Sequence, residues 1–225
     1  MSAVFITGTG TDIGKTFVAT GLIRALRRTG QPVRALKPVV SGFDPAAAQD
    51  SDPGAMLAAL GQPVTPETVA AIAPWRFRAP LSPDMAARRE GGTVDLDAVL
   101  GFCRQAMAQR DGTLLIEGVG GIMVPLDARR TVLDWMEALG LPIILVCGSY
   151  LGSISHTLTA VDVLIRHGLR LATLVVNESA GSTVDLLETV ETLARFTGPL
   201  RIVALPRTAA GVPDHPVFGQ IAAFL

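Results

Sequence analysis

Short apolar runs alternate with amphipathic stretches along almost the whole chain. Six runs are nearly continuously apolar, at residues 3–7, 33–40, 113–117, 142–147, 171–177 and 200–205. Such runs are typical of parallel strands that are covered by helices on both faces. The stretches between them predict helices at 14–28, 52–60, 96–109, 132–139, 154–167 and 184–195. In the first helix Val18, Leu22 and Leu26 recur at the spacing of a single buried face.

This alternation predicts one α/β domain over residues 1–225, built on a doubly wound, mainly parallel sheet flanked by helices. The segment near 43–90 is irregular and rich in Pro and Ala, so we expect an insertion with its own short helices. Ligands of open parallel sheets bind at the carboxyl ends of the strands. Residues that follow strands are therefore the first candidates for chemistry.

Composition narrows the kind of partner. Of 225 residues 49% are hydrophobic and 17% are charged, which provides a large core and excludes global disorder. The net charge of −1 argues against nucleic acid or an anionic membrane as the main partner and favours small molecules. The first residues lack the features of a secretory signal, and the two cysteines form no metal-binding pattern. We therefore expect a soluble cytoplasmic protein.

A glycine-rich loop follows the first strand, where residues 8–16 read GTGTDIGKT and lead into a helix. Backbone N–H groups at such a helix start can bind phosphates, Lys15 can reach the β- and γ-phosphate oxygens, and Thr16 can bind Mg²⁺. The usual pattern has four residues between its first glycine and Gly-Lys, but five separate Gly8 from Gly14 here. The context nevertheless predicts a P-loop NTPase-like fold.

Only two of the 19 basic residues are lysines, and both are predicted to point to one site. Lys37 ends the second apolar run, whose carboxyl end should adjoin the loop that carries Lys15. Glu117 ends another buried run, where a carboxylate can complete a Mg²⁺ site opposite Thr16. Asp52 is either the N-cap of a short helix or a further Mg²⁺ ligand, and the sequence barely separates these two roles.

An ordered set of motifs resembles the dethiobiotin synthetase family over essentially the whole chain. Besides the loop, the motifs are KPVVSG at 37–42, SD at 51–52, PLSP at 80–83, IEGVGGIMVPL at 116–126 and LGSISH at 151–156. The displaced first glycine is similar to that family's own variant of the loop. The resemblance implies a homodimeric ligase that uses Mg²⁺ and ATP, and that acts on 7,8-diaminopelargonic acid and CO₂ or bicarbonate. It implies neither a nucleic-acid nor a membrane partner.

The reaction implied by the resemblance has three stages. One amine of the substrate takes up CO₂ as a carbamate, and the carbamate then attacks the γ-phosphate of ATP to give a carbamic–phosphoric anhydride. The second amine closes a cyclic urea, with release of ADP and phosphate. Crowded negative charge must be stabilised in such a reaction.

The resemblance also implies roles for residues at matching positions. Lys37 is the catalytic lysine, and Lys15 and Thr11 help to hold the carbamate and the γ-phosphate. Thr16, Asp52 and Glu117 are the Mg²⁺ ligands. The implied nucleotide-binding residues are Asp12, Ile13, Gly14, Lys15, Thr16, Phe17, Asp52, Glu117, Gly118, Val119, Gly120, Asn177, Glu178, Pro206, Arg207 and Thr208, with Asn177 reading adenine. The implied substrate-binding residues are Ser41, Leu151 and Gly152.

Two positions depart from the family pattern. Ser155 stands where the family commonly has asparagine, and Tyr150 is the only tyrosine, so a tyrosine contact from the partner subunit has no match. Both departures concern the tail of the substrate. The alternative function is a switch or partition-type ATPase that binds a protein or DNA. Its second loop lysine is missing here, because Gly10 and Thr11 occupy that region.

Overall fold

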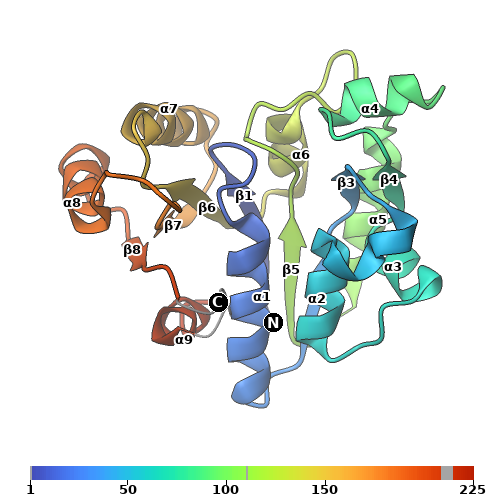
Figure 1. Cartoon of the computed structure of the whole chain (residues 1–225), viewed down its shortest axis with the longest axis horizontal. Helices are drawn as coiled ribbons and strands as arrows, with labels where there is room; N and C mark the ends of the chain where they lie inside the picture. The colour runs from blue at the N-terminus through green and yellow to red at the C-terminus, as the bar shows by residue number, and fades with distance from the viewer. Residues whose placement is uncertain (1, 110, 209–214) are drawn as a thin grey trace.

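Six strands form a parallel sheet at the centre of the structure (Figure 1). The computed structural model describes residues 2–109, 111–208 and 215–225. In spatial order the strands are β2 (Val33–Leu36), β5 (Thr113–Glu117), β1 (Ala3–Gly8), β6 (Ile143–Gly148), β7 (Leu171–Asn177) and β8 (Ile202–Leu205). All neighbouring pairs are parallel, so the carboxyl ends of the strands share one edge.

Helices cover both faces of this sheet, which confirms the predicted fold class. On one face α1 (Lys15–Arg28) packs against α2 (Asp52–Leu60) and α9 (Pro216–Ala222). Right-handed connections between the parallel strands bring the other long helices to the opposite face. These are α5 (Leu96–Ala108), α6 (Val132–Leu139), α7 (Ser153–Arg166) and α8 (Leu186–Thr197). Among the described residues no helix has the length and apolar character needed to cross a membrane.

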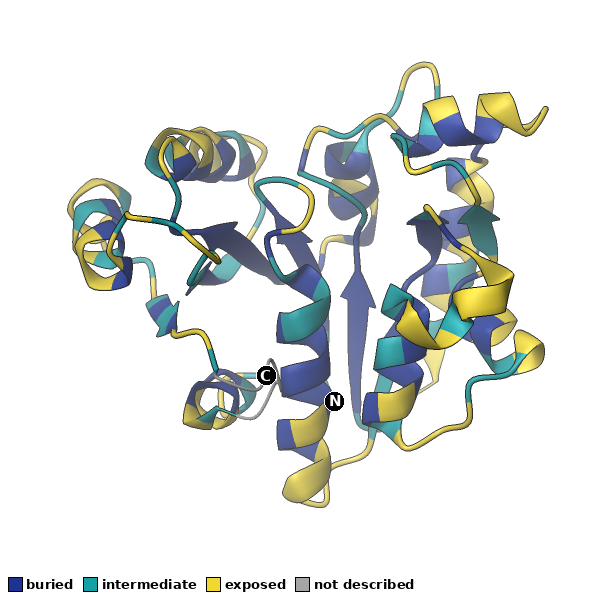
Figure 2. Ribbon diagram, in the orientation of Figure 1, coloured by how far each residue is buried: buried dark blue, intermediate teal, exposed yellow. Residues whose placement is uncertain are grey.

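The interior of the sheet explains the continuous apolar runs. Every residue of β5 and β6 is buried, and Figure 2 shows the central strands in the colour of buried residues. The rings of Phe5 in β1 and Trp135 in α6 meet edge to face with centroids 5.0 Å apart, and both are fully buried. Packing on both faces thus removes the apolar–polar alternation that a half-exposed strand would show.

The predicted strand at 33–40 is wrong, because the chain leaves the main sheet in its middle. β2 ends at Leu36, while β3 (Val39–Ser41) pairs with β4 (Trp75–Phe77) in a separate two-stranded parallel sheet. Pro38 has no N–H group for a sheet hydrogen bond, and the Lys37 N–H donates to the Ile72 carbonyl at 3.0 Å. The break directs Lys37 to the carboxyl edge of the main sheet.

Proline marks the starts of the helices in the segment 43–90. This segment contains the 3-10 helix η1 (Pro45–Asp50), α2, α3 (Pro66–Ile72), β4 and α4 (Pro83–Arg89). Each of these four helices has a proline in its first two positions, where the missing N–H costs no hydrogen bond. The helix α9 starts in the same way at Pro216, after His215, and was not predicted because its pattern spans only seven residues.

The predicted ends of α2 and α6 match the structure, and the ends of the other predicted helices differ by no more than two residues. The largest difference is at α8, predicted at 184–195 and observed from Leu186 to Thr197. Asp185 accepts hydrogen bonds from the N–H groups of Leu187 and Glu188, at 2.7 and 2.9 Å. The carboxylate therefore caps the helix and fixes its start.

A glycine in α1 allows α9 to pack closely, and its replacement is expected to destabilise the fold. A Cβ atom at Gly21 would lie 2.4 Å from Cζ of the fully buried Phe218 ring. We expect Gly21→Ala to lower the free energy of unfolding by about 1–3 kcal/mol, as overpacking does. Urea denaturation measures this change.

Gly101 in α5 provides the matched control, because an added Cβ there meets no atom within 4 Å. Gly101→Ala is expected to raise the free energy of unfolding by about 0.5–1 kcal/mol through helix propensity alone. Equal stabilisation by both substitutions would show that α9 does not press against Gly21.

Candidate active site

The phosphate-binding loop is fixed to the sheet at both ends. The Thr9 N–H donates to the Val146 carbonyl of β6 at 3.0 Å, and the Asn177 side-chain amide donates to the Ile13 carbonyl at 3.0 Å. Gly14, with φ +94°, adopts a left-handed conformation that favours glycine and ends the loop at the start of α1. The loop therefore curves around the helix N-terminus, where backbone N–H groups can bind an anion.

A buried ionic network lies beside this loop. The Lys37 ammonium is 2.5 Å from Glu117 Oε1 and 3.2 Å from Asp52 Oδ2, and it donates to the Gly118 carbonyl at 2.8 Å. The Thr16 hydroxyl donates to the same Glu117 oxygen at 2.8 Å. Both members of the Lys37–Glu117 pair are buried. The structure thus brings together side chains from four separate segments, as the positions of the two lysines and Glu117 predicted.

The structure also separates the two interpretations of Asp52. The cap of α2 is Ser51, whose hydroxyl accepts a hydrogen bond from the Gly54 N–H at 3.2 Å. Asp52 is instead the first helical residue, and its carboxylate faces Lys37. The N-cap interpretation of Asp52 is therefore wrong.

The charges of the network depend on one another. Burial by itself lowers the pKa of Lys37, but the Glu117 and Asp52 carboxylates outweigh it and raise the pKa above its ordinary value. Burial raises the pKa of Glu117, and Lys37 only partly opposes this. Burial acts on the pKa of Asp52 in the same direction, but Lys37 and the Thr16 hydrogen bond hold that pKa below its ordinary value. Lys37 therefore keeps its positive charge at neutral pH.

The second lysine has a different electrostatic setting. Burial and then the positive charge of Lys37 lower the pKa of Lys15 to about 8. The Lys15 ammonium donates to the Gly10 carbonyl of the loop at 2.6 Å. Lys15 and Lys37 line the same pocket, and two neighbouring cations favour a ligand with several negative charges.

A pocket of about 820 Å³ adjoins the network and is lined by ten of the 21 predicted site residues. The predicted residues that line it are Thr11, Asp12, Gly14, Lys15, Thr16, Lys37, Ser41, Asp52, Val119 and Gly120. Further lining residues, to which the sequence gave no role, are Val40, Gly42, Asp50, Ser51, Pro80, Leu81, Ser82, Pro83 and Val124. All of these except Asp50 belong to the motifs KPVVSG, SD, PLSP and IEGVGGIMVPL, but the motifs did not indicate where these residues lie in space.

One buried oxygen of the pocket lining and one of the ionic network have no protein partner. Within the described residues, the Ser41 hydroxyl and Glu117 Oε2 make no hydrogen bond. Buried polar groups are nearly always paired, so these atoms indicate a polar ligand or an ion. Glu117, the Thr16 hydroxyl and the half-exposed Asp52 form an all-oxygen set of the kind that Mg²⁺ prefers. No cluster of three or more Asp, Glu, His or Cys suited to a metal occurs in the described parts of the chain.

The other predicted nucleotide-binding residues lie outside this pocket. Asn177 reaches the loop from the end of β7, and Glu178 accepts a hydrogen bond from the Arg207 N–H at 2.7 Å beyond β8. Phe17 packs edge-on against Phe218, with ring centroids 5.9 Å apart, and so its side chain faces α9. Three further predicted residues, at 206–208, follow β8 directly. The Gly118 carbonyl accepts the hydrogen bond from Lys37, and the Ile13 carbonyl accepts the one from Asn177.

The predicted substrate-binding residues fall into two places. Ser41 lines the pocket, whereas Leu151 and Gly152 lie at the start of α7, where Leu151 is 92% exposed. The residues of this second place are not among those that line the pocket.

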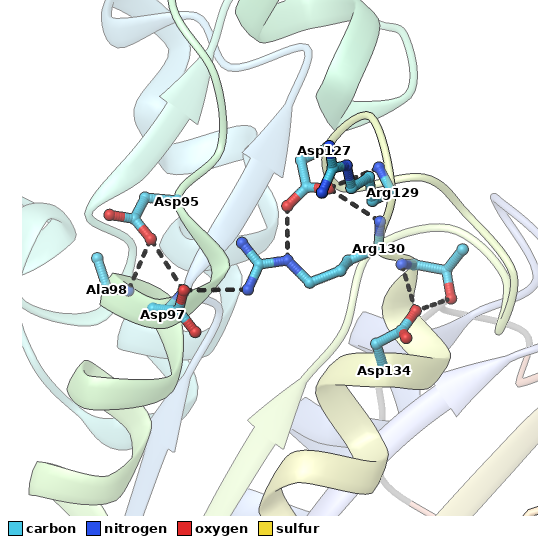
Figure 3. Close-up of polar contacts among 8 residues, drawn as sticks. Asp95, Asp97, Ala98, Asp127, Arg129, Arg130 and Asp134 are labelled. Atoms are coloured by element: carbon cyan, nitrogen blue, oxygen red, sulfur yellow. Dashed lines mark hydrogen bonds and ion pairs between the residues drawn. The ribbon is translucent and has the colours of Figure 1, made fainter.

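The wall formed by the loop after β5 is anchored at its far end by Arg130 (Figure 3). The Arg130 guanidinium bonds to Asp127 within the loop at 2.8 Å and to Asp97 of α5 at 3.1 Å. Asp127 also accepts hydrogen bonds from the N–H groups of Arg129 and Arg130, both at 2.8 Å. Since Lys37 holds the other end of the loop at Gly118, the pocket wall is fixed on both sides.

The parallel sheet, the glycine-rich loop and the adjoining Lys-Thr pair define a nucleotide-binding protein of the P-loop class. Solved structures agree with this at the level of the fold. The MinD cell division protein of Aquifex aeolicus superimposes with a TM-score of 0.59 at 13% identity, over 100% of this chain and 95% of that one. MinD of Pyrococcus horikoshii, in complex with Mg-ADP, gives 0.57 at 17% identity, over 98% and 94%.

Sequence relatives identify the family. A family model described as an AAA domain matches residues 2–215. The ATP-dependent dethiobiotin synthetase BioD of Methylobacterium nodulans is 50% identical over 92% of this chain and 94% of its own length. The enzymes of the same name from Acidiphilium cryptum and Caulobacter vibrioides are each 49% identical, over 88% and 92% of this chain and 89% and 93% of their own. The chain belongs to the ATP-dependent dethiobiotin synthetase family, which confirms the predicted resemblance and the prediction of an ATP-dependent ligase.

The buried pair is expected to show strong energetic coupling. Lys37→Met and Glu117→Gln should each lower the free energy of unfolding by about 3 kcal/mol, because each leaves a buried charge without its main partner. The double variant should lose clearly less than the sum of the two. Urea denaturation of the four proteins measures this, and strictly additive losses would contradict the pairing.

Proposed function

We propose that this protein forms dethiobiotin from 7,8-diaminopelargonic acid, CO₂ and ATP in the presence of Mg²⁺, with release of ADP and phosphate. The observation that carries the proposal is the buried Lys37 ammonium, held between Glu117 and Asp52 in the pocket that also contains Lys15. The names of the relatives at 49–50% identity support the choice of product. The pocket's two cations suit the anionic groups that this reaction brings together.

The proposed reaction proceeds in three steps. An amine of the substrate adds to CO₂ and loses a proton, which gives a carbamate. A carbamate oxygen then bonds to the γ-phosphorus of ATP as the bond to ADP breaks. The second amine attacks the carbonyl carbon of the resulting anhydride, closes the five-membered urea and expels phosphate together with a proton.

The residues of the chain act on the charge that develops in these steps. Lys37 and Lys15 stabilise the negative oxygens that approach one another when the carbamate meets the γ-phosphate. The Ser41 hydroxyl, which has no protein partner within the described residues, is suited to orient the carbamate, and Thr11 lines the same pocket. Thr16, Asp52 and Glu117 would hold Mg²⁺, which when bound neutralises charge on the phosphates.

The remaining contacts extend away from the reacting groups. The backbone of residues 12–17 would surround the triphosphate, while Asn177, Glu178 and residues 206–208 would contact the base. An amide suits adenine because it can donate and accept at once. The N-terminus of α7, with Leu151 and Gly152, would receive the substrate carboxylate across a homodimer, through backbone N–H groups that do not depend on the side chain of Ser155.

Product analysis tests the proposal directly. The protein is incubated with 7,8-diaminopelargonic acid, bicarbonate, Mg²⁺ and ATP, and dethiobiotin is quantified by mass spectrometry alongside phosphate release. One dethiobiotin per phosphate is expected, with no phosphate release when the diamine is left out. Steady phosphate release without the diamine and without dethiobiotin would favour a switch-type ATPase instead.

Substitution of Lys37 separates binding from chemistry. Lys37→Gln is expected to lower kcat at least about 100-fold, because it removes a cation from the transferring charge. The dissociation constant for ATP, measured by calorimetry, should change by no more than about threefold. Arg88→Gln is the control, since Arg88 is exposed and pairs only with Asp84 among the described ion pairs. Full activity of Lys37→Gln would remove this lysine from the mechanism.

A further inference from the structure

One side chain links the end of β7 to the phosphate-binding loop. The Asn177 amide nitrogen donates to the Ile13 carbonyl at 3.0 Å, although the two residues are 164 positions apart in the chain. Asn177 lies in register with Gly148 of β6, so the central sheet fixes its position. The contact joins the rigid sheet to the segment of the loop that precedes α1.

This segment of the loop needs support from outside. Asp12 has φ +56°, which is unfavourable for a residue with a side chain, and Gly14 has φ +94°. The hydrogen-bond ladder of α1 begins with the Val18 N–H and the Gly14 carbonyl at 2.9 Å, one residue after Ile13. Ile13 therefore lies between two residues with left-handed backbone conformations, Asp12 and Gly14, and precedes the first hydrogen bond of α1. Its carbonyl accepts a hydrogen bond from the Asn177 side chain.

The fit between Asn177 and the loop is close. A Cβ atom at Gly14 would lie 2.2 Å from the Asn177 amide nitrogen, so the amide packs directly against the backbone of Gly14. Because the Ile13 carbonyl can only accept, the amide must present its NH₂ group to the loop. The Asn177 amide thus fills the space beside Gly14 and also donates a hydrogen bond to the carbonyl of the preceding residue, Ile13.

We infer that Asn177 is a positioning residue for the phosphate-binding loop, in addition to any contact with a base. It holds the Ile13 carbonyl, and thereby directs the loop N–H groups toward a polyphosphate. This inference rests on the proposed binding of ATP at the loop, but it makes a claim of its own. The affinity for a polyphosphate without a base should depend on Asn177.

Inorganic tripolyphosphate is the probe for this claim, because it has the phosphates of ATP and no base. For Asn177→Ala we expect calorimetric affinities for Mg²⁺-tripolyphosphate about fivefold weaker than for the unaltered protein, the ratio that one neutral hydrogen bond supplies. The affinity for Mg²⁺-ATP should fall by at least the same factor. With the full set of substrates, KM for ATP should rise while kcat changes by no more than about twofold.

Thr173→Val is the matched control on the same strand. It removes a hydrogen bond of similar length, from the Thr173 hydroxyl to the Arg201 carbonyl at 3.2 Å, at the opposite part of β7. Its tripolyphosphate affinity should stay within about twofold of the original, because the loop is untouched. Thermal unfolding of both variants establishes that they are folded at the temperature of the titration, and Asn177→Ser replaces the alanine variant if that one does not fold.

Three results would overturn the inference. An unchanged tripolyphosphate affinity with a weaker ATP affinity would make Asn177 a base contact only. Equal losses in Thr173→Val would reduce the effect to general destabilisation of β7. Failure of the unaltered protein to bind tripolyphosphate would remove the loop as a phosphate site. Binding without dethiobiotin formation would instead contradict the proposed function and leave the role of Asn177 intact.

Discussion

The structure depends on one buried positive charge, the ammonium group of Lys37. A charge in this position is costly unless it is paired, and here two carboxylates and a carbonyl group surround it. To supply those partners, β5 must end in Glu117 at the level of the loop and α2 must begin with Asp52. The break in the second strand at Pro38 leaves Lys37 at the carboxyl edge of the sheet, beside these partners.

The remaining features of the site follow from the shared edge of a parallel sheet. The phosphate-binding loop, Glu117 and Asn177 each follow or end a different strand, and parallel pairing brings all three to the same side. The main sheet thus supplies the rigid part of the nucleotide site. The two-stranded sheet of β3 and β4, with η1 and the start of α4, supplies the opposing wall. The Lys37 network lies where these two parts meet.

Much of this arrangement could be predicted from the sequence, for reasons that are specific to each element. Fully buried strands such as β5 and β6 appear in the sequence as continuous apolar runs, and the residue types of the loop indicate its chemistry. The run at 33–40 was predicted as one strand because Val39 and Val40 are as apolar as the residues of β2. Hydropathy does not reveal that the two halves of the run form hydrogen bonds with different sheets. The role of Asp52 required knowledge that Ser51 already caps the helix. The wall formed by residues 80–83 could not be foreseen, since the position of a connecting segment depends on contacts distant in the sequence.

The separate small sheet has a consequence for how such a protein can diversify. Ser41 belongs to β3, which hydrogen-bonds to β4 and not to the central strands, so the wall that faces the phosphate-binding loop has its own scaffold. Exchanges within residues 75–83 can remodel that wall while Asp52, Glu117 and the ends of the central strands keep their positions. Selection for a different ligand can therefore act on one part of the chain without disturbing the glycine-rich loop and the Lys37 network.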